Sequence, residues 1–424
     1  MNRRLIDDCF LSDKDRLTHN EALEILKSNV APLTDVQTIQ LDNALNRVLG
    51  EDVIAPRAIP AHNNAAVDGY SFCYKDYHNK GDVNFLLHGR VTAGEPELHD
   101  IPKSCATRIF TGAVMPAGHD TVVMQEDVQI KENQSGNDKV IIPAGLKPSA
   151  NCRKAGEDTR EGDILAAKGE KLKPQHIAAI ASGGYDAVKA FKPLEIAYFS
   201  TGDEIIRPGE IFQLGKVFDA NAPMLSALTA DPAHLVSDLG VLKDDAEIVQ
   251  SALKEAAKSK HVLITSGGAS KGEEDHIVSS LSKLGSSHLW QLAIKPGRPM
   301  TFGQINDTIF IGLPGNPVAA FVCYLLYVTP LLRRLSGSTW FEPRRFQIPA
   351  NFEIKSKKPD RREFLRAKII SENGKLTAQK FGQDGSGLIR SITQSEGLIE
   401  LEETITSINK GDLVPVIPYS EFGI

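Results

Sequence analysis

The chain has 424 residues, of which 41% are hydrophobic and 24% are charged. This length is too great for one ordinary hydrophobic core, so several structural units are expected. The formal net charge of -6 argues against a general nucleic-acid binder. It does not exclude an anionic small substrate, because a few Lys and Arg residues can reverse the sign of the charge inside a cleft.

The cysteines and the apolar runs indicate a cytoplasmic protein. The five cysteines are scattered, without a Cys-x-x-Cys pair, which favours a reduced intracellular protein over a disulfide framework or a zinc site: Cys9, Cys73, Cys105, Cys152 and Cys323. Asp7 and Asp8 stand where a signal peptide needs an apolar core. The apolar run of residues 317–332 is shorter than a membrane-spanning helix needs, so a buried helix is expected.

The N-terminal third predicts helices followed by a β domain. Thr18 and Glu21 have the spacing of a capping box, which predicts a helix to about Val30. Apolar residues at helical spacing over 41–49 predict a second helix that ends at Gly50. Short β-rich pieces then alternate with turn residues over 51–142 and predict a small β domain: VNFLLHGRV, ATRIF, DTVVMQEDVQI and KVIIPA.

The rest of the chain predicts an α/β domain and a second β domain. Pro174 and Gly183 frame a short helix over 174–182. From residue 194 to 336, three apolar β runs alternate with helical stretches, which is typical of a doubly wound α/β domain: LEIAYFS, HVLITS and TIFIGLP. Residues 340–424 contain short strands broken by Gly and Pro, which predict a small β-barrel or sandwich.

Loops with unusual composition follow the three apolar β runs. Ligands of an open α/β sheet bind beyond the carboxyl ends of its strands, and glycine loops before helices suit phosphates. Each loop alone is explained at least as well by a turn or a cap, but their coincidence at one predicted sheet edge favours a binding site. The substrate-binding candidates are Asp203, Gly267, Gly268, Ser270, Lys271, Pro314, Gly315 and Asn316.

A proline-rich turn between these loops displays Lys295 and Arg298. The same rim gathers the acids Asp203, Glu204 and Asp275. Carboxylates beside a phosphate site usually hold a Mg²⁺ that bridges the acid and the ligand. The combination predicts phosphoanhydride or phosphoester chemistry.

Ten motifs, in one order along nearly the whole chain, resemble those of the molybdopterin molybdotransferases, a family that includes the E domain of gephyrin. They are AAVDGY (65–70), FTGAVMPAGHDTVVMQED (110–127), RKAGEDTREGDIL (153–165), FSTGDEI (199–205), FDANAPML (218–225), LGVLKDD (239–245), TSGGASKGEED (265–275), AIKPGRP (293–299), GLPGNPVAA (312–320) and RREFLR (361–366). So many motifs in one order make the resemblance highly specific.

The resemblance implies a multidomain α/β plus β fold and a homodimer in which both subunits build each cleft. The implied fold of each subunit has a doubly wound α/β domain, an inserted β domain, an elongated linking domain and a C-terminal small β-barrel. The expected bounds are 1–50 and 145–182 for the linking domain, 51–144 for the inserted domain, 183–336 for the α/β domain and 337–424 for the C-terminal domain.

The reaction implied by the resemblance is replacement of AMP on adenylated molybdopterin by molybdate, assisted by Mg²⁺. Bringing one anion to another needs cations at close range. The family motifs imply catalytic roles for Asp68, Thr111, Glu204, Lys295, Arg298 and Arg361, and a Mg²⁺ held by Asp244 and Asp275. As plain sequence, Asp68 and Thr111 more often cap turns, and Arg361 is more often a surface strand charge.

Three departures from the family pattern concern substrate contacts. Ala65, Ala220 and Gln291 replace two serines and a lysine that the family usually has. Two other functions stay open: a molybdopterin adenylyltransferase, which normally consists of the α/β module alone, and a gephyrin-like scaffold without catalysis. The expected partners are a second copy of the chain, an anionic small molecule and the upstream adenylyltransferase, with neither nucleic acid nor membrane.

Overall fold

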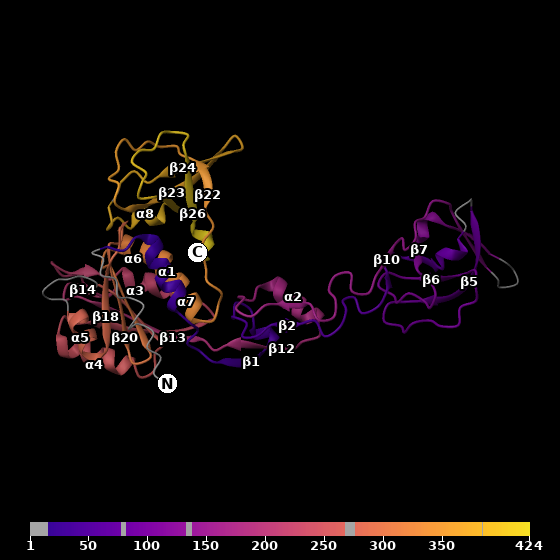
Figure 1. The fold of residues 1–424 in the computed structure, drawn as a ribbon, viewed down its shortest axis with the longest axis horizontal. Helices are drawn as coiled ribbons and strands as arrows, with labels where there is room; N and C mark the ends of the chain where they lie inside the picture. The colour runs from indigo at the N-terminus through magenta and orange to yellow at the C-terminus, as the bar shows by residue number, and fades with distance from the viewer. Residues whose placement is uncertain (1–15, 78–81, 133–137, 268–275, 384) are drawn as a thin grey trace. The chain divides into compact units, whose positions relative to one another are not determined.

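The chain forms two compact units in a computed structural model that describes residues 16–77, 82–132, 138–267, 276–383 and 385–424. The first unit contains residues 1–51, 168–173 and 189–424, and the second contains residues 52–167 and 174–188. Figure 1 shows the chain as a ribbon with its elements labelled. The five segment bounds expected from the sequence stay a prediction.

A six-stranded mixed sheet lies at the centre of the first unit. The order is β16 (His234–Leu242), β13 (Leu194–Thr201), β17 (Val262–Ser266), β21 (Thr308–Leu313), β20 (Pro299–Ile305) and β18 (Ser286–Gln291). The first four strands are parallel, whereas β20 and β18 are antiparallel to their neighbours. The three apolar runs are therefore the adjacent strands β13, β17 and β21, buried as parallel strands usually are.

Helices cover both faces of this sheet, which confirms the doubly wound α/β fold. Residues of β13 alternate between the faces, so Phe199 packs with α4 and α5 while Tyr198 packs with α1, α3 and the helix of residues 317–335. These helices are α1 (His19–Asn29), α3 (Asn221–Thr229), α4 (Ala246–Ala256), α5 (His276–Leu284), α6 (Pro317–Cys323), a π-helical turn (Tyr324–Val328) and α7 (Thr329–Leu335).

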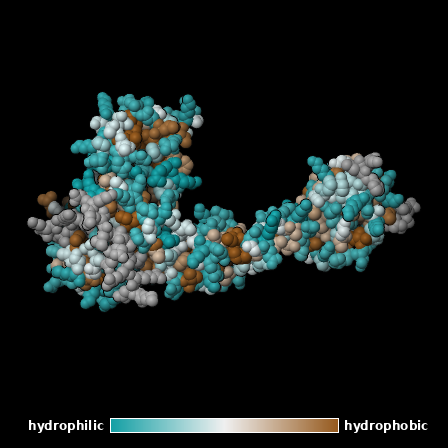
Figure 2. Space-filling model, viewed as in Figure 1, coloured by the Kyte–Doolittle hydropathy of each residue, from teal (hydrophilic) through white to brown (hydrophobic). Residues whose placement is uncertain are grey.

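The helix of residues 317–335 is the one element of the described chain that is long and apolar enough to cross a membrane. Within the structure, 83% of its most apolar window is buried, and its side chains belong to the largest hydrophobic cluster. The expected buried helix is therefore confirmed. In the view of Figure 2, hydrophilic residues predominate at the surface and hydrophobic residues occupy small separate areas.

The N-terminal capping box is present as predicted. The Thr18 hydroxyl accepts the backbone N–H of Glu21 at 3.3 Å, and the Glu21 carboxylate accepts that of Thr18 at 2.9 Å. The second predicted helix is wrong: β1 (Val36–Gln40) and a 3₁₀ turn (Leu41–Asn43) precede β-bridges at Val48 and Leu49. Backbone pairing of these bridges with distant residues outweighs the local helical pattern.

A second six-stranded sheet forms most of the second unit and confirms the inserted β domain. The order is β7 (Thr121–Met124), β4 (Gly69–Phe72), β6 (Cys105–Ile109), β5 (Val83–Val91), β9 (Lys139–Ile142) and β8 (Gln129–Lys131). The four β-rich pieces of the sequence supply β5 to β9. The unit also contains α2 (Pro174–Ser182), as predicted, and the short pairs β2 (Val53–Ile54) with β11 (Ile164–Ala166) and β3 (Asn64–Ala65) with β10 (Cys152–Arg153). The strand β12 (Ala187–Phe191) pairs with β1.

The C-terminal residues of the first unit form a small closed barrel, as expected. Its strands are β22 (Phe346–Pro349), β23 (Arg362–Glu372), β24 (Lys375–Lys380), β25 (Gly397–Leu401) and β26 (Leu413–Pro418). A bridge between Ala350 and Ala378 joins the two edge strands and closes the barrel around a buried apolar cluster. The short strand β19 (Ile294–Lys295) pairs in parallel with β23.

Candidate functional site

The ends of β13, β17 and β21 lie side by side, as the sequence predicts. Ser266 pairs with Ser200 on one side and with Leu313 on the other. Gly267 has a φ of +93°, and its N–H donates to the carbonyl of Leu313 at 3.1 Å. A β-carbon at Gly267 would lie 3.3 Å from the Thr201 carbonyl, so glycine lets these loops approach one another. Gly268, Ser270, Lys271 and Asp275 lie outside the described residues.

A cavity of about 540 Å³, here named the strand-end crevice, opens beyond these strands. Its lining includes Ser200, Thr201, Glu204, Asp219, Asn221, Ser266, Gly267, Gly315 and Asn316. Asn221 at the start of α3 ties two loops together, because its amide nitrogen lies 2.5 Å from the Ser266 hydroxyl and 2.8 Å from the Gly315 carbonyl. The Asp219 carboxylate accepts the first N–H groups of α3 and faces Arg207 at 3.3 Å.

Two of the predicted acids meet at these strand ends, a position here called the rim, although neither belongs to the described lining of the crevice. Asp203 follows β13 and Asp244 follows the neighbouring strand β16, and the Asp244 N–H donates to the Asp203 carboxylate at 3.3 Å. Both residues are exposed. No group of three or more His, Cys, Asp and Glu side chains that could hold a metal ion is found among the described residues. The exposed carboxylates fit Mg²⁺, which usually binds one or two protein acids together with substrate phosphates and water.

A second cavity, of about 460 Å³, shares Gly315 and Asn316 with the crevice and is here named the cationic hollow. Five cationic side chains line it: Arg16, Lys295, Arg298, Arg361 and Arg366. No acidic residue belongs to its described lining, which also contains Pro314 and Ser386. Cations concentrated in a partly enclosed space favour anions. The structure therefore brings Lys295, Arg298 and Arg361 together, as the family motifs imply.

The hollow is built at the pairing of β19 with β23. Ile294 pairs with Arg362 and Lys295 with Glu363. The buried carboxylate of Glu363 lies 3.6 Å from the Lys295 ammonium and 3.4 Å from the Arg361 guanidinium. One carboxylate thus holds two cations close together despite their mutual repulsion. The sequence reasoning assigned no role to Glu363, although RREFLR contains it.

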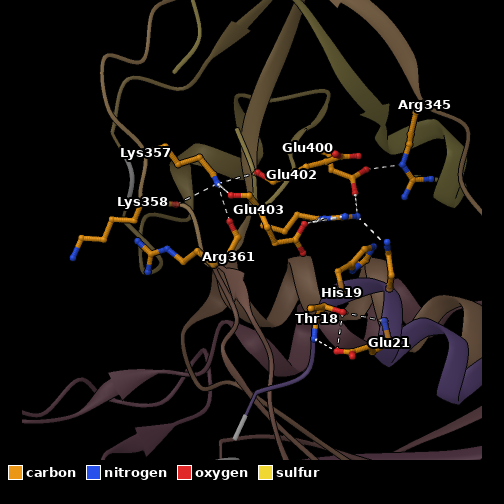
Figure 3. Close-up of polar contacts among 12 residues, drawn as sticks. Thr18, His19, Glu21, Arg345, Lys357, Lys358, Arg361, Glu400, Glu402 and Glu403 are labelled. Carbon is orange, nitrogen blue, oxygen red and sulfur yellow. Dashed lines mark hydrogen bonds and ion pairs between the residues drawn. The ribbon is translucent and has the colours of Figure 1, made fainter. Parts of the chain in front are cut away.

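A buried lysine fixes the turn that carries Arg361. The Lys357 side chain is 6% exposed, and its ammonium donates to the carbonyls of Arg361 at 2.8 Å and Glu402 at 3.0 Å. Figure 3 shows Lys357 pointing into this ring of carbonyl groups. Burial lowers the pKa of Lys357 from its ordinary value. The neighbouring Arg362 pairs with Glu400 at 2.7 Å and Glu403 at 3.0 Å, which anchors the start of β23.

Replacing Lys357 with Met is expected to raise the anion concentration needed for half-saturation roughly 10-fold, because a displaced Arg361 no longer faces the hollow. Titration of the variant with molybdate measures this effect. Lys171→Met is the matched control, since it also removes a partly buried ammonium, that of an ion pair with Asp231. Equal weakening of molybdate binding in both variants would show general destabilisation and contradict the role of Lys357.

The second unit contains the pair Asp68 and Thr111. One Asp68 oxygen accepts the backbone N–H of Thr111 at 2.8 Å and its hydroxyl at 2.7 Å. These two hydrogen bonds lower the pKa of Asp68, so the carboxylate stays charged at neutral pH. The pair therefore presents one fixed negative charge at the start of β4. The departure at Ala65 lies close by in the chain, where its side chain is fully buried in a hydrophobic cluster.

The expected charged and catalytic residues of the described chain thus occur in three groups: Asp203, Glu204 and Asp244 at the rim, Lys295, Arg298 and Arg361 in the hollow, and Asp68 with Thr111 in the second unit. Of the other expected substrate-binding residues, Gly267, Gly315 and Asn316 line the crevice, and Pro314 lines the hollow. Asn221, Arg16, Glu363 and Arg366 were missed. The quoted motifs FDANAPML and RREFLR contain three of them, but neither motif shows which side chains face a cavity.

Three family models match successive parts of the chain. They are the MoeA N-terminal region (domain I and II) at residues 17–184, a probable molybdopterin binding domain at 197–334 and the MoeA C-terminal region (domain IV) at 347–419. Together they span most of the described fold.

Individual relatives match over almost their full length. The chain is 34% identical over 406 residues to a molybdopterin molybdenumtransferase of Haemophilus influenzae, with 95% of this chain and 99% of that protein covered. It is 29% identical over 391 residues to that of Bacillus subtilis, with 90% of each covered. A crystal structure of the molybdopterin biosynthesis moeA protein of Pyrococcus horikoshii superposes with a TM-score of 0.80 at 26% identity, covering 95% of this chain and 100% of that one. The chain therefore belongs to the molybdopterin molybdenumtransferase family.

Proposed function

We propose that the protein inserts molybdate into adenylated molybdopterin and releases AMP. Family membership makes it a transferase of molybdenum cofactor biosynthesis. The observation that supports molybdate insertion in particular is the position of the cationic hollow next to the strand-end crevice. Gly315 and Asn316 line both cavities. One cavity can hold the organic substrate while the other holds a small oxyanion.

The charges of the site fit this reaction. Molybdate is a dianion and the adenylated substrate carries phosphates, so their approach is opposed by Coulomb repulsion. Lys295, Arg298 and Arg361 would hold the oxyanion and offset that repulsion. Asp244 and Asp275 would hold Mg²⁺, which supplies charge neutralisation for the departing AMP. Glu204, which lines the crevice, would bind an outer water or the pterin edge.

The test is incubation of the protein with adenylated molybdopterin, molybdate and Mg²⁺. Insertion predicts release of AMP and formation of active cofactor. Consumption of ATP with free molybdopterin would instead show adenylation, and the absence of either reaction would favour a scaffold. The five cations of the hollow favour insertion over adenylation, because adenylation needs no additional oxyanion.

A homodimer with shared sites in the cytoplasm completes this proposal, with the upstream adenylyltransferase as a candidate partner. The Asp68–Thr111 pair and the cationic hollow belong to different compact units of the chain. An exposed apolar loop between β14 (Ile205–Ile206) and β15 (Val217–Phe218), next to the crevice, suits a protein contact. Its side chains Ile211, Phe212 and Leu214 are 87%, 59% and 98% exposed.

Subunit complementation is expected to restore activity if both chains build each site. Asp68→Ala and Asp275→Ala variants, each inactive alone, are mixed under conditions that exchange subunits. A two-fold dimer then regains one intact site for each mixed dimer, measured as AMP release. Mixing two preparations of the same variant is the control. No recovery despite proven exchange would mean that each chain builds its own site.

A further inference from the structure

Two polar side chains of the strand-end crevice are buried without full hydrogen bonding. Ser200 is 2% exposed and Asn221 is 7% exposed, and both line the crevice. Neither the Ser200 hydroxyl oxygen nor the Asn221 amide oxygen has a hydrogen-bond partner among the described residues. A buried polar atom without a hydrogen-bond partner lowers the stability of the protein by roughly 1–3 kcal/mol. A ligand that supplied the missing partners would remove that cost.

The contacts of Asn221 fix which of its atoms faces the ligand. The Gly315 carbonyl, 2.8 Å away, can only accept, so the amide nitrogen must face it and the amide oxygen must point elsewhere. The same nitrogen lies 2.5 Å from the Ser266 hydroxyl, so both amide hydrogens are used. What remains is the amide oxygen, which is an acceptor only.

Ser200 lines the same crevice as this acceptor. It pairs in register with Ser266 on the neighbouring strand, and Ser266 contacts the Asn221 amide. Paired residues of adjacent strands project to the same side of a sheet. The crevice therefore presents an acceptor from α3 and, from the neighbouring strand β13, a hydroxyl that can donate. A primary amine beside a ring nitrogen has the matching pattern, because the amine donates and the ring nitrogen accepts.

We propose that the crevice recognises the amino-substituted edge of a nitrogen heterocycle. The Asn221 amide oxygen accepts from the exocyclic amine, and the Ser200 hydroxyl donates to the adjacent ring nitrogen. This inference rests on the proposed function, since the adenine and the pterin of adenylated molybdopterin both carry such an edge. A cavity of about 540 Å³ lies within the usual size of small-molecule sites.

Two pairs of ligands test the proposal on the full chain by titration calorimetry. AMP is compared with inosine monophosphate, and pterin with lumazine; in each pair an oxo group replaces the amine. The amino member of one pair is expected to bind roughly 10- to 100-fold more tightly than the oxo member, because the oxo ligand leaves one buried hydrogen bond unmade. A preference for AMP assigns the crevice to adenine, and a preference for pterin assigns it to the pterin.

Two variants test whether Ser200 and Asn221 cause the preference for the amino ligand. Ser200→Ala and Asn221→Leu should each reduce the ratio of the affinities of the amino and oxo ligands several-fold. Because Asn221→Leu also removes the contacts to Ser266 and Gly315, the smaller change at Ser200 is the decisive one. Thr265→Val is the matched control: its hydroxyl is also buried without a described partner, but it does not line the crevice, so the preference should persist.

Equal affinity within both pairs, binding of neither member, or a preference unchanged in Ser200→Ala would overturn the proposal. Its failure is separable from failure of the proposed function. If the wild-type protein releases AMP from adenylated molybdopterin without an amino preference, only this inference fails. If the amino preference holds but molybdate triggers no AMP release, the crevice assignment stands and the insertion reaction does not.

Discussion

Replacing Lys295 with Met is expected to raise the molybdate concentration for half-maximal AMP release roughly 10- to 100-fold, because one charged hydrogen bond to the anion is lost. The change has a second effect in the same direction. Among the ion pairs of the described residues, Glu363 would keep the one with Arg361, so its buried carboxylate would be less neutralised and would oppose the incoming dianion. Steady-state AMP release at varied molybdate measures both effects together.

A second substitution separates the two effects. Glu363→Gln in the Lys295→Met background removes the carboxylate that has lost one of its two cations, and it should recover part of the lost affinity. Lys27→Met is the matched control, because Lys27 forms an exposed ion pair with Glu342 outside the hollow. An unchanged molybdate requirement in Lys295→Met would exclude this lysine from anion binding.

Loss of Asp275 is expected to impair AMP release more strongly than loss of Lys295. Asp275→Asn should lower Mg²⁺-dependent AMP release roughly 1000-fold, because a metal bound at a phosphoryl group contributes several kcal/mol to catalysis. Asp244→Asn should act in the same direction, since Asp244 stands at the rim beside Asp203. Thermal unfolding should change little in Asp244→Asn, because an exposed carboxylate has no role in the core.

Asp307→Asn is the matched control for the metal variants. Asp307 is exposed in the turn between β20 and β21, at the end of the sheet opposite the crevice. Its AMP release should equal that of the wild type at every Mg²⁺ concentration. Full activity of Asp275→Asn at saturating Mg²⁺ would be incompatible with a metal-binding role.

Local patterns predicted most of the fold. The β-rich piece VNFLLHGRV is β5, and the capping box at Thr18 begins α1, because both patterns depend on residues close in sequence. The predicted helix over 41–49 failed for the opposite reason. Val48 and Leu49 find their hydrogen-bond partners at Phe191 and Glu170, more than a hundred residues away, and a local pattern contains no information on such partners.

The position of the candidate site was also predictable from the sequence, but only part of its lining was. Parallel strands end at one edge, so Ser200, Ser266 and Leu313 were expected to meet, and they do. The additional cations were not foreseeable. Arg366 reaches the hollow from β23, which pairs with β19, and Arg16 reaches it beside the bridge of Leu17 with Leu292.

The pairing of β19 with β23 also means that the two cavities take their side chains largely from different parts of the chain. The strand-end crevice is made mainly by the α/β domain, with Gly387 and Ile389 added from the segment between β24 and β25, whereas the hollow takes Arg361 and Arg366 from the barrel and Lys295 from the strand beside it. Substitutions of Arg361 or Arg366 can therefore retune the choice of oxyanion, for example between molybdate and the similarly shaped tungstate, while every residue that lines the crevice is kept. A chimaera that exchanges the barrel strands but keeps Gly387 and Ile389 would transfer oxyanion preference while the lining of the crevice stays the same.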